Sequence, residues 1–324
     1  MQIVLCGCVR MGWMSGAKTG VTSDRTISAS ATDLRADATL FLAGCRTLVV
    51  GDGDFTFAHA LVEKWLPSKV SLVATCYDST DEVVSKYPRS AERIARMRDA
   101  GAQVLCGVDA TRLHTSPVAA QASFDRIVFN FPQVPGTKDV VPNRMMLAKF
   151  LRCAEALLDR DGLVLVSNKN VSPYSWWRLE CLHEFAGGSL SLLAELPWQR
   201  TEYPALYAGP CNVDRDQSVK AGDAVIFVYA HPTCRADGLP RSPPSRDTQE
   251  YRCGICRVCP RTEADLKNHE SGKMHQKRAS LERLWEETVA AAGGIEDFQR
   301  ESPSVACPPA ESQPHKRQRT SANF

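Results

Sequence analysis

Short apolar runs alternate with amphipathic segments across residues 43–232. The runs are rich in β-branched residues and predict buried strands, whereas the segments between them repeat apolar residues at helical spacing. Expected strands cover Thr47–Val50, Val70–Cys76, Gln103–Cys106, Phe124–Phe129, Leu163–Val166, Ser189–Leu196 and Ala224–Tyr229. Expected helices cover Phe57–Leu66, Ser90–Ala100, Asn143–Leu158 and Pro173–Phe185. This alternation predicts a doubly wound, Rossmann-like α/β domain with a parallel sheet covered on both faces.

The segments outside this domain have different compositions. We expect residues 1–42 to be a disordered leader, although basic residues without acids in its first part also allow a transit peptide. Residues 233–250 contain several prolines and predict a linker. Residues 251–292 hold a compact Cys/His unit and a following helix, expected at Ala279–Ala292, and residues 293–324 form a polar tail that we expect to be disordered. No apolar run is long enough to predict a membrane span.

A glycine-rich turn follows the first expected strand. It reads Gly51-Asp52-Gly53-Asp54-Phe55, and Thr56 stands where a dinucleotide-binding turn has its third glycine. The larger side chain would crowd a pyrophosphate, and Asp52 and Asp54 would repel one. S-adenosylmethionine (SAM) carries no phosphate and has cationic sulfonium and amino groups, which these carboxylates would attract. The alternative is an ordinary strand-to-helix turn with solvated acids.

Acidic residues also follow the second and third expected strands. Asp78 is positioned to accept hydrogen bonds from both hydroxyls of a ribose, and Asp109 from the exocyclic amine of an adenine. Either residue could instead cap the helix that follows it, which is the more common role of a single aspartate at a strand end.

The fourth expected strand ends in Asn130-Phe131-Pro132-Gln133. The Asn130 amide offers a donor and an acceptor to the edge of a base, Phe131 can stack on a ring, and Pro132 stiffens the loop. Taken alone, the segment is more typical of a turn. The glycine-rich turn, Asp78 and Asp109, however, follow three successive strands, and three such features are much less likely to be accidental than one.

Several segments, in this order, resemble one protein family. They are Leu48–Leu61 (LVVGDGDFTFAHAL), Tyr77-Asp78-Ser79, Lys86-Tyr87-Pro88, Gly101–Thr111, Phe124–Gln133, Asn143-Arg144, Pro173–Trp176, Tyr203-Pro204 and Tyr207. Together they resemble the Rossmann-like methyltransferase domain of the large-subunit rRNA uridine-N3 methyltransferases. The resemblance implies a SAM-dependent enzyme that methylates N3 of a uridine in rRNA.

The resemblance also implies roles for individual residues. The methionine end of SAM would lie against Gly51, Gly53 and Phe55, its ribose against Asp78 and its adenine against Asp109. The target base would face Asn130, Phe131 and Pro132. One departure is Gln133, because the family usually has histidine there, and glutamine cannot accept a proton.

The C-terminal unit carries a metal-ligand pattern. Cys253-x2-Cys256-x12-His269-x5-His275 matches the spacing of tetrahedral zinc sites, and Cys259 is left over. The two histidines are six residues apart and cannot share one face of a straight helix, so the helix must be interrupted near Gly272. This wide spacing resembles the U1/matrin-type zinc fingers, which implies binding of RNA.

Charge adds to this picture of the finger. The chain has a net charge of only +2, but residues 251–283 contain eight basic and four acidic side chains. Lys267, Lys273, Lys277 and Arg278 are candidates for phosphate contacts, with protein contact as the alternative. Most of the thirteen cysteines are scattered through apolar surroundings, as expected for buried thiols in a reducing compartment.

These observations predict a SAM-dependent RNA methyltransferase with zinc and RNA as further partners. We expect it in the nucleus, and in the nucleolus in particular, with the cytoplasm or mitochondrion as alternatives. Lys316-Arg317-Gln318-Arg319 is a short candidate nuclear localisation signal. The main alternative function is that of an inactive methyltransferase-like adaptor that binds RNA or assembling ribosomes. A nicotinamide-dependent oxidoreductase fits less well, because it needs the third glycine of the turn.

Overall fold

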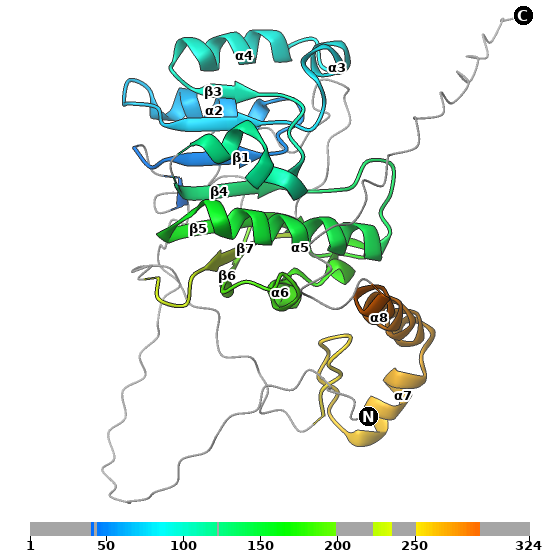
Figure 1. Ribbon diagram of the computed structural model, residues 1–324. Helices are drawn as coiled ribbons and strands as arrows, with labels where there is room; N and C mark the ends of the chain where they lie inside the picture. The colour runs from blue at the N-terminus through cyan, green and yellow to red at the C-terminus, as the bar shows by residue number, and fades with distance from the viewer. Residues whose placement is uncertain (1–39, 42–43, 122, 199–222, 235–250, 292–324) are drawn as a thin grey trace, which may run out of the picture. The chain divides into compact units, whose positions relative to one another are not determined.

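The computed structural model describes residues 40–41, 44–121, 123–198, 223–234 and 251–291, all of which belong to one compact unit. Its centre is a seven-stranded sheet of order β3-β2-β1-β4-β5-β7-β6 (Figure 1). The strands are β1 (Thr47–Val50), β2 (Leu72–Thr75), β3 (Gln103–Leu105), β4 (Phe124–Asn130), β5 (Leu158–Lys169), β6 (Ser191–Pro197) and β7 (Ala224–Ala230). The strand order reverses direction between β1 and β4, which confirms the doubly wound α/β fold.

The sheet is mixed rather than wholly parallel. Strands β1 to β5 pair in parallel, but β7 is antiparallel to both β5 and β6. The expectation of a parallel sheet was therefore wrong for β7. An apolar strand buried on both faces has the same composition in either direction, so its sequence does not reveal which way it runs.

Helices cover both faces of the sheet. Those of the main domain are α2 (Thr56–Trp65), α3 (Thr80–Lys86), α4 (Ser90–Asp99), α5 (Val140–Leu157) and α6 (Leu179–Leu182), with short 3₁₀ helices η1 (Ala110–Thr115), η2 (Pro117–Ala120), η3 (Tyr174–Trp177) and η4 (His183–Phe185). Val49 packs in the apolar layer with α2 and α4, whereas its neighbours Leu48 and Val50 pack in the layer with α5. This alternation gives the sheet two separate hydrophobic layers.

Two segments differ from the helices expected. The segment Pro173–Phe185 is divided into η3, α6 and η4, because Arg178 adopts a left-handed backbone with φ of 54°. Helix α3 was not anticipated, although its start carries a capping box in which Ser79 and Glu82 satisfy each other's backbone N–H groups. That signal is visible in the sequence as Ser-x-x-Glu.

The Cys/His unit contributes α7 (Glu263–Ser271) and α8 (Lys273–Ala291). Helix α8 begins six residues before the helix expected at Ala279–Ala292, and it packs on the main domain. Trp285 is 1% exposed and lies in the same apolar layer as α5. Arg144 of α5 donates from Nη2 to Glu282 Oε1 (2.6 Å) and from Nη1 to Oε2 (2.9 Å), while its Nε and Nη2 donate to the Trp176 carbonyl. The finger is thus anchored through its last helix.

Other expectations fall on parts of the chain outside the described residues. These are residues 1–39 and 42 of the expected leader, nearly all of the linker, the polar tail, the signal Lys316–Arg319 and the family segment around Tyr203 and Tyr207. Leu40 and Phe41 of the expected leader are described and buried in the apolar core, so the expectation of disorder was wrong for them. Within the described ranges, no helix combines the length and apolarity that crossing a bilayer requires.

The ion pair of Arg144 yields a prediction for stability. Substituting Glu282→Gln keeps the side-chain shape but leaves the guanidinium of Arg144, which is 2% exposed, without its counter-charge. We expect the free energy of unfolding to fall by about 3 kcal/mol, measured by chemical denaturation. Glu286→Gln on the exposed side of the same helix is the control. Equal losses for the two variants would contradict a buried, stabilising pair.

Candidate functional site

The turn after β1 is tightly constrained. Gly51 has a φ of +64°, and a Cβ atom there would lie 2.6 Å from Cε2 of Phe129 on β4. The Asp52 N–H donates to the Thr75 carbonyl of β2 (2.9 Å). Glycine is therefore required at position 51 for steric as well as conformational reasons. The turn is held at the carboxyl ends of β1, β2 and β4, where the strand order reverses.

The two aspartates of this turn have different environments. Asp54 is fully buried and accepts hydrogen bonds from Thr56 N (3.0 Å) and Oγ1 (2.7 Å), and it pairs with Arg93 Nη1 at 3.3 Å. Asp52 is partly exposed, and its Oδ2 accepts from Ala58 N at 2.7 Å. Burial and the neighbouring Asp54 carboxylate raise the pKa of Asp52 to about 7. Asp52 therefore changes charge near neutral pH.

Two residues assigned to the cofactor from the sequence have inaccessible side chains. Asp54 is occupied by Thr56 and Arg93, and Phe55 is 0% exposed with a φ of 60°. Only their backbone atoms remain available to a ligand in this conformation. Asp52 and the backbone at Gly53 stay candidates for direct contact.

The acids after β2 and β3 lie on neighbouring segments. The Gly107 N–H donates to the Asp78 carbonyl and the Val108 N–H to the Cys76 carbonyl, both at 2.9 Å. The Asp78 side chain is not a helix cap, since Ser79 fills that role, and its Oδ1 accepts from Lys86 Nζ at 2.8 Å.

Asp109 does act as a helix cap. Its Oδ1 accepts from both Thr111 N (2.8 Å) and Thr111 Oγ1 (2.7 Å) at the start of η1. The capping alternative therefore holds for Asp109 and fails for Asp78. The cap also fixes the orientation of the Asp109 carboxylate at the end of the third strand.

The side-chain amide of Asn130, at the end of β4, uses its oxygen but not its nitrogen in hydrogen bonds within the described structure. Its Oδ1 accepts from Ser167 Oγ of β5 at 2.7 Å, which fixes the orientation of the amide. Its Nδ2 is buried and has no hydrogen-bond partner among the described residues. Leaving such a donor unpaired costs about 1–3 kcal/mol, so this atom is a strong indication of a ligand acceptor at this position.

The rest of the Asn-Phe-Pro-Gln segment is held by its neighbours. Phe131 adopts a φ of 50°, donates its N–H to the Ser167 carbonyl (2.8 Å) and packs edge-on against Trp198. Pro132 is buried, whereas Gln133 is exposed. Asn130 is therefore the residue of this segment whose polar side chain a neighbouring strand orients.

Asn143 on α5 holds in place the loop between Gln133 and the start of α5. It is 0% exposed, its Oδ1 accepts from Val134 N (2.8 Å), and its Nδ2 donates to the carbonyls of Asp139 (2.8 Å) and Thr137 (3.4 Å). Asn143 stands in one of the segments that resemble the family, but the sequence alone did not indicate a role for it. Its apolar helical surroundings were the available signal, since a buried asparagine must find several partners.

The Cys/His residues come together as their spacing predicts. The ligand atoms of Cys253, Cys256, His269 and His275 all lie within 4.8 Å of one another. His275 Nδ1 is 3.4 Å from Cys253 Sγ, 3.7 Å from Cys256 Sγ and 3.3 Å from His269 Nε2. A tetrahedral zinc ion with bonds of about 2.0–2.3 Å separates its ligand atoms by roughly 3.3–3.8 Å, so this geometry fits one.

The helix break between the two histidines is confirmed. Helix α7 ends at Ser271, and Gly272 is extended with φ of −71° and ψ of 143° before α8 begins at Lys273. The break turns His275 back towards His269. Cys259 is exposed and lies outside the cluster, as its leftover position in the motif predicted.

Comparison with known proteins agrees with this arrangement. A family model described as BMT5-like, rRNA (uridine-N3-)-methyltransferase, matches residues 48–208, which contain the whole cluster at the strand ends. Residues 48–208 are therefore a domain of the BMT5-like family. The match ends ahead of the Cys/His cluster, so the finger is a separate addition to the BMT5-like domain.

Individual relatives cover different shares of the chain. Heavy metal-associated isoprenylated plant protein 41 of Arabidopsis thaliana is 35% identical in an alignment of 164 residues that covers 48% of this chain and 31% of that protein. The 25S rRNA (uridine(2634)-N(3))-methyltransferase of Saccharomyces cerevisiae is 22% identical in an alignment, gaps included, of 242 residues that covers 56% of this chain and 71% of that protein. TrmN from Thermus thermophilus gives a TM-score of 0.37 at 18% identity over 58% of this chain and 44% of that chain, a likeness too distant to carry an argument. The chain thus spans under a third of the plant relative.

The raised pKa of Asp52 predicts a pH-dependent stability. The folded pKa of about 7 lies above the ordinary value of 3.8, so the native state holds an extra proton between these values. The free energy of unfolding contributed by Asp52 therefore falls as pH rises through that window. Asp52→Asn keeps an acceptor for Ala58 N and removes the charge. As pH rises from about 5 to 7.5, we expect the free energy of unfolding of Asp52→Asn to increase by about 1–2 kcal/mol relative to that of the native protein, measured by denaturation.

The control for this prediction is Asp99→Asn, an exposed aspartate at the end of α4. Its stability difference from the native protein should stay constant over the same pH range. If the free energy of unfolding of Asp52→Asn also differs from the native value by a constant amount over this pH range, the raised pKa assigned to Asp52 is wrong.

Proposed function

We propose that this protein is a SAM-dependent RNA methyltransferase that methylates N3 of a uridine in large-subunit rRNA. The observation that carries the proposal is Asn130, whose amide is oriented by Ser167 and whose buried Nδ2 has no protein partner in the described structure. Its position at the carboxyl edge of the sheet suits a planar base with a carbonyl acceptor. Membership of residues 48–208 in the BMT5-like family and the name of the yeast relative support the choice of uridine and rRNA.

The residues at the strand ends fit SAM. The turn at Gly51 brings backbone close to the site, and Asp52 offers a carboxylate near the cationic end of such a cofactor. Asp78 and Asp109 would hold the ribose and the adenine. When bound, SAM would supply a methyl group whose bond to the sulfonium sulfur breaks readily, because the thioether that departs is a good leaving group. The chain's own task is to bind and orient the base beside it.

A uridine N3 becomes a good nucleophile only when it loses its imide proton, which would pass to solvent water. Asn130 Nδ2 would donate a hydrogen bond to a carbonyl oxygen of the base and so stabilise the negative charge that develops there. Gln133 is exposed and has no group that takes up a proton, so we assign it no base role. Catalysis by this chain rests on orientation and on stabilising the imide anion. A uridine within a duplex must be flipped out to reach the site.

We further propose that Cys253, Cys256, His269 and His275 bind one structural zinc ion. The mutual distances of their ligand atoms and the break at Gly272 support this assignment. The finger would then contribute to RNA binding. An enzyme acting on large-subunit rRNA is expected in the nucleolus or elsewhere in the nucleus.

The second candidate is an adaptor that has the fold but no activity. The observation in its favour is Gln133, at the position where the resemblance leads us to expect histidine. The two candidates differ in one product. The purified protein is incubated with SAM and rRNA that lacks the modification, and the nucleosides are analysed by mass spectrometry. Formation of 3-methyluridine supports the enzyme, and its absence with a protein that still binds the rRNA supports the adaptor.

Asn130→Ala tests the site directly. Removing the one oriented donor should reduce turnover by about 10²–10³-fold, because that hydrogen bond is strongest when the imide is charged. The affinity for SAM should stay nearly unchanged, since the amide faces the base. Gln103→Ala, which truncates an exposed amide side chain at the start of β3, is the control. Turnover of Asn130→Ala equal to that of the control would remove Asn130 from the reaction.

Cys256→Ser tests the metal site. The variant should lose its zinc, measured by elemental analysis, because the thiolate is one of four ligands. Its affinity for RNA should fall while its affinity for SAM is kept. Cys259→Ser changes a neighbouring exposed cysteine outside the cluster and should retain zinc. Equal zinc content in the two variants would contradict the assigned ligand set.

A further inference from the structure

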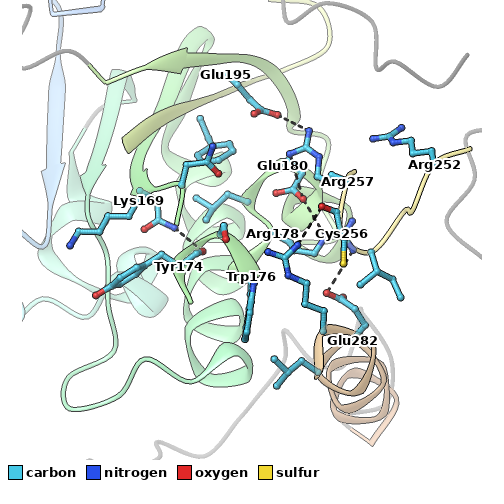
Figure 2. Close-up of a pocket in the computed structure, with 18 of the residues that line it drawn as sticks. Lys169, Tyr174, Trp176, Arg178, Glu180, Glu195, Arg252, Cys256, Arg257 and Glu282 are labelled. Carbon is cyan, nitrogen blue, oxygen red and sulfur yellow. Dashed lines mark hydrogen bonds and ion pairs between the residues drawn. The ribbon is translucent and has the colours of Figure 1, made fainter. Parts of the chain in front are cut away.

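A cavity of about 540 Å³ lies between the end of β5, helix η3 and the Cys/His unit. Figure 2 shows Lys169 and Tyr174 at one end of this pocket and Arg252 and Cys256 towards the other. The pocket is separate from the residues proposed above for SAM. Both the main domain and the finger contribute to its walls.

The acids of the pocket are already neutralised. Glu282 pairs with Arg144 at 2.6 Å, Glu180 with Arg178 at 3.2 Å and Glu195 with Arg257 at 3.3 Å. Each of the three glutamates thus has an arginine partner. Figure 2 shows these glutamates beside Arg178 and Arg257. The remaining cations of the pocket decide which charge it attracts.

Lys169 and Arg278 of the pocket, together with Lys138 and Lys277 beside it, lie near two aromatic rings of η3. Lys138 Nζ and Lys169 Nζ lie 5.9 Å and 5.1 Å from the centroid of Tyr174. Lys277 Nζ and Arg278 Cζ each lie 5.3 Å from the centroid of Trp176. We name these six residues, Lys138, Lys169, Tyr174, Trp176, Lys277 and Arg278, the cation track. It joins the main domain to α8.

The two lysines at Tyr174 carry charges that no carboxylate of the described residues balances. Within the described ranges, neither Lys138 nor Lys169 forms an ion pair with a carboxylate. Burial and the charge of Lys138 lower the pKa of Lys169. Two ammonium groups therefore lie near one ring and repel each other, and a bound anion would relieve this repulsion.

The cation track begins beside the proposed target base. Lys138 lies in the loop that Asn143 locks behind Asn130. Lys169 follows two residues after Ser167, which binds Asn130 Oδ1. From there the track runs along η3 to Lys277 and Arg278 of the finger. A chain of anionic groups entering at the target base would meet all four cations in turn.

We propose that the cation track holds the backbone phosphates of the substrate RNA strand next to the target nucleotide. Phosphates suit this surface because they repeat along the strand and make favourable contacts with lysine and arginine. The anchoring of α8 by Arg144 and Trp285 gives the two halves of the track a fixed spacing. The inference rests on the proposed function for the identity of the RNA, but it makes its own prediction about phosphate binding.

The test uses the full chain with the double substitution Lys138→Gln/Lys169→Gln. Its binding to a fluorescent single-stranded oligouridylate of about 16 nucleotides is measured by anisotropy between about 50 and 200 mM salt. We expect roughly tenfold weaker binding. The slope of log affinity against log salt should fall by about 1.4, which is about 0.7 for each phosphate that the variant no longer neutralises. The affinity for SAM, measured by calorimetry, should be unchanged, which shows that the fold is intact.

The matched control is Lys64→Gln/Lys69→Gln, which removes two exposed lysines near the amino-terminal edge of the sheet, at the end of α2 and ahead of β2. Its salt dependence should equal that of the native protein. An unchanged salt dependence in Lys138→Gln/Lys169→Gln would overturn the inference. Displacement of the RNA by an equally charged polyglutamate peptide would also overturn it, because the track would then serve an acidic protein.

Failure of the proposed function gives a different result. A native protein that forms no 3-methyluridine, yet binds RNA with the salt dependence predicted here, refutes the enzyme and keeps the track. A protein that methylates rRNA while the double variant binds RNA like the native chain refutes the track and keeps the enzyme.

Discussion

The buried guanidinium of Arg144 joins parts of the chain that are far apart in sequence. It binds the Trp176 carbonyl at the end of η3 and the Glu282 carboxylate of α8, and it lies beside the Trp285 ring. Its neighbour Asn143 holds the loop behind Asn130. The start of α5 thus fixes the candidate active site on one side and the finger on the other. Without this constraint, neither the pocket nor the cation track would have a defined geometry.

The candidate site combines satisfied and unsatisfied polar groups. Asp54, Asp109 and Asn143 are used by the protein to shape the loops at the strand ends. Asn130 Nδ2 is left without a partner in the described structure, and the pKa of Asp52 is raised to about 7. Such uncompensated groups cost stability and are typical of positions where a ligand completes the hydrogen bonding. The fold therefore serves to present a small number of oriented polar atoms.

Sequence reasoning found the features that depend on local pattern. All seven strands overlap the runs in which they were expected, and the spacing of Cys253, Cys256, His269 and His275 predicted both their cluster and the break at Gly272. It missed what depends on distant contacts. The reversed direction of β7 follows from the assembly of the sheet. The pairing of Arg144 with Glu282 joins residues 138 positions apart, and nothing near either one indicates its partner. The burial of Asp54, in the turn before α2, depends likewise on its ion pair with Arg93 of α4.

Calorimetric titration of the full chain with SAM is the most direct measurement of the central claim, which is that the carboxyl edge of the sheet binds this cofactor. The account predicts saturable binding of one SAM per chain. Absence of binding by a protein that circular dichroism shows to be folded would contradict it. The domain would then be an RNA-binding adaptor that keeps the methyltransferase fold.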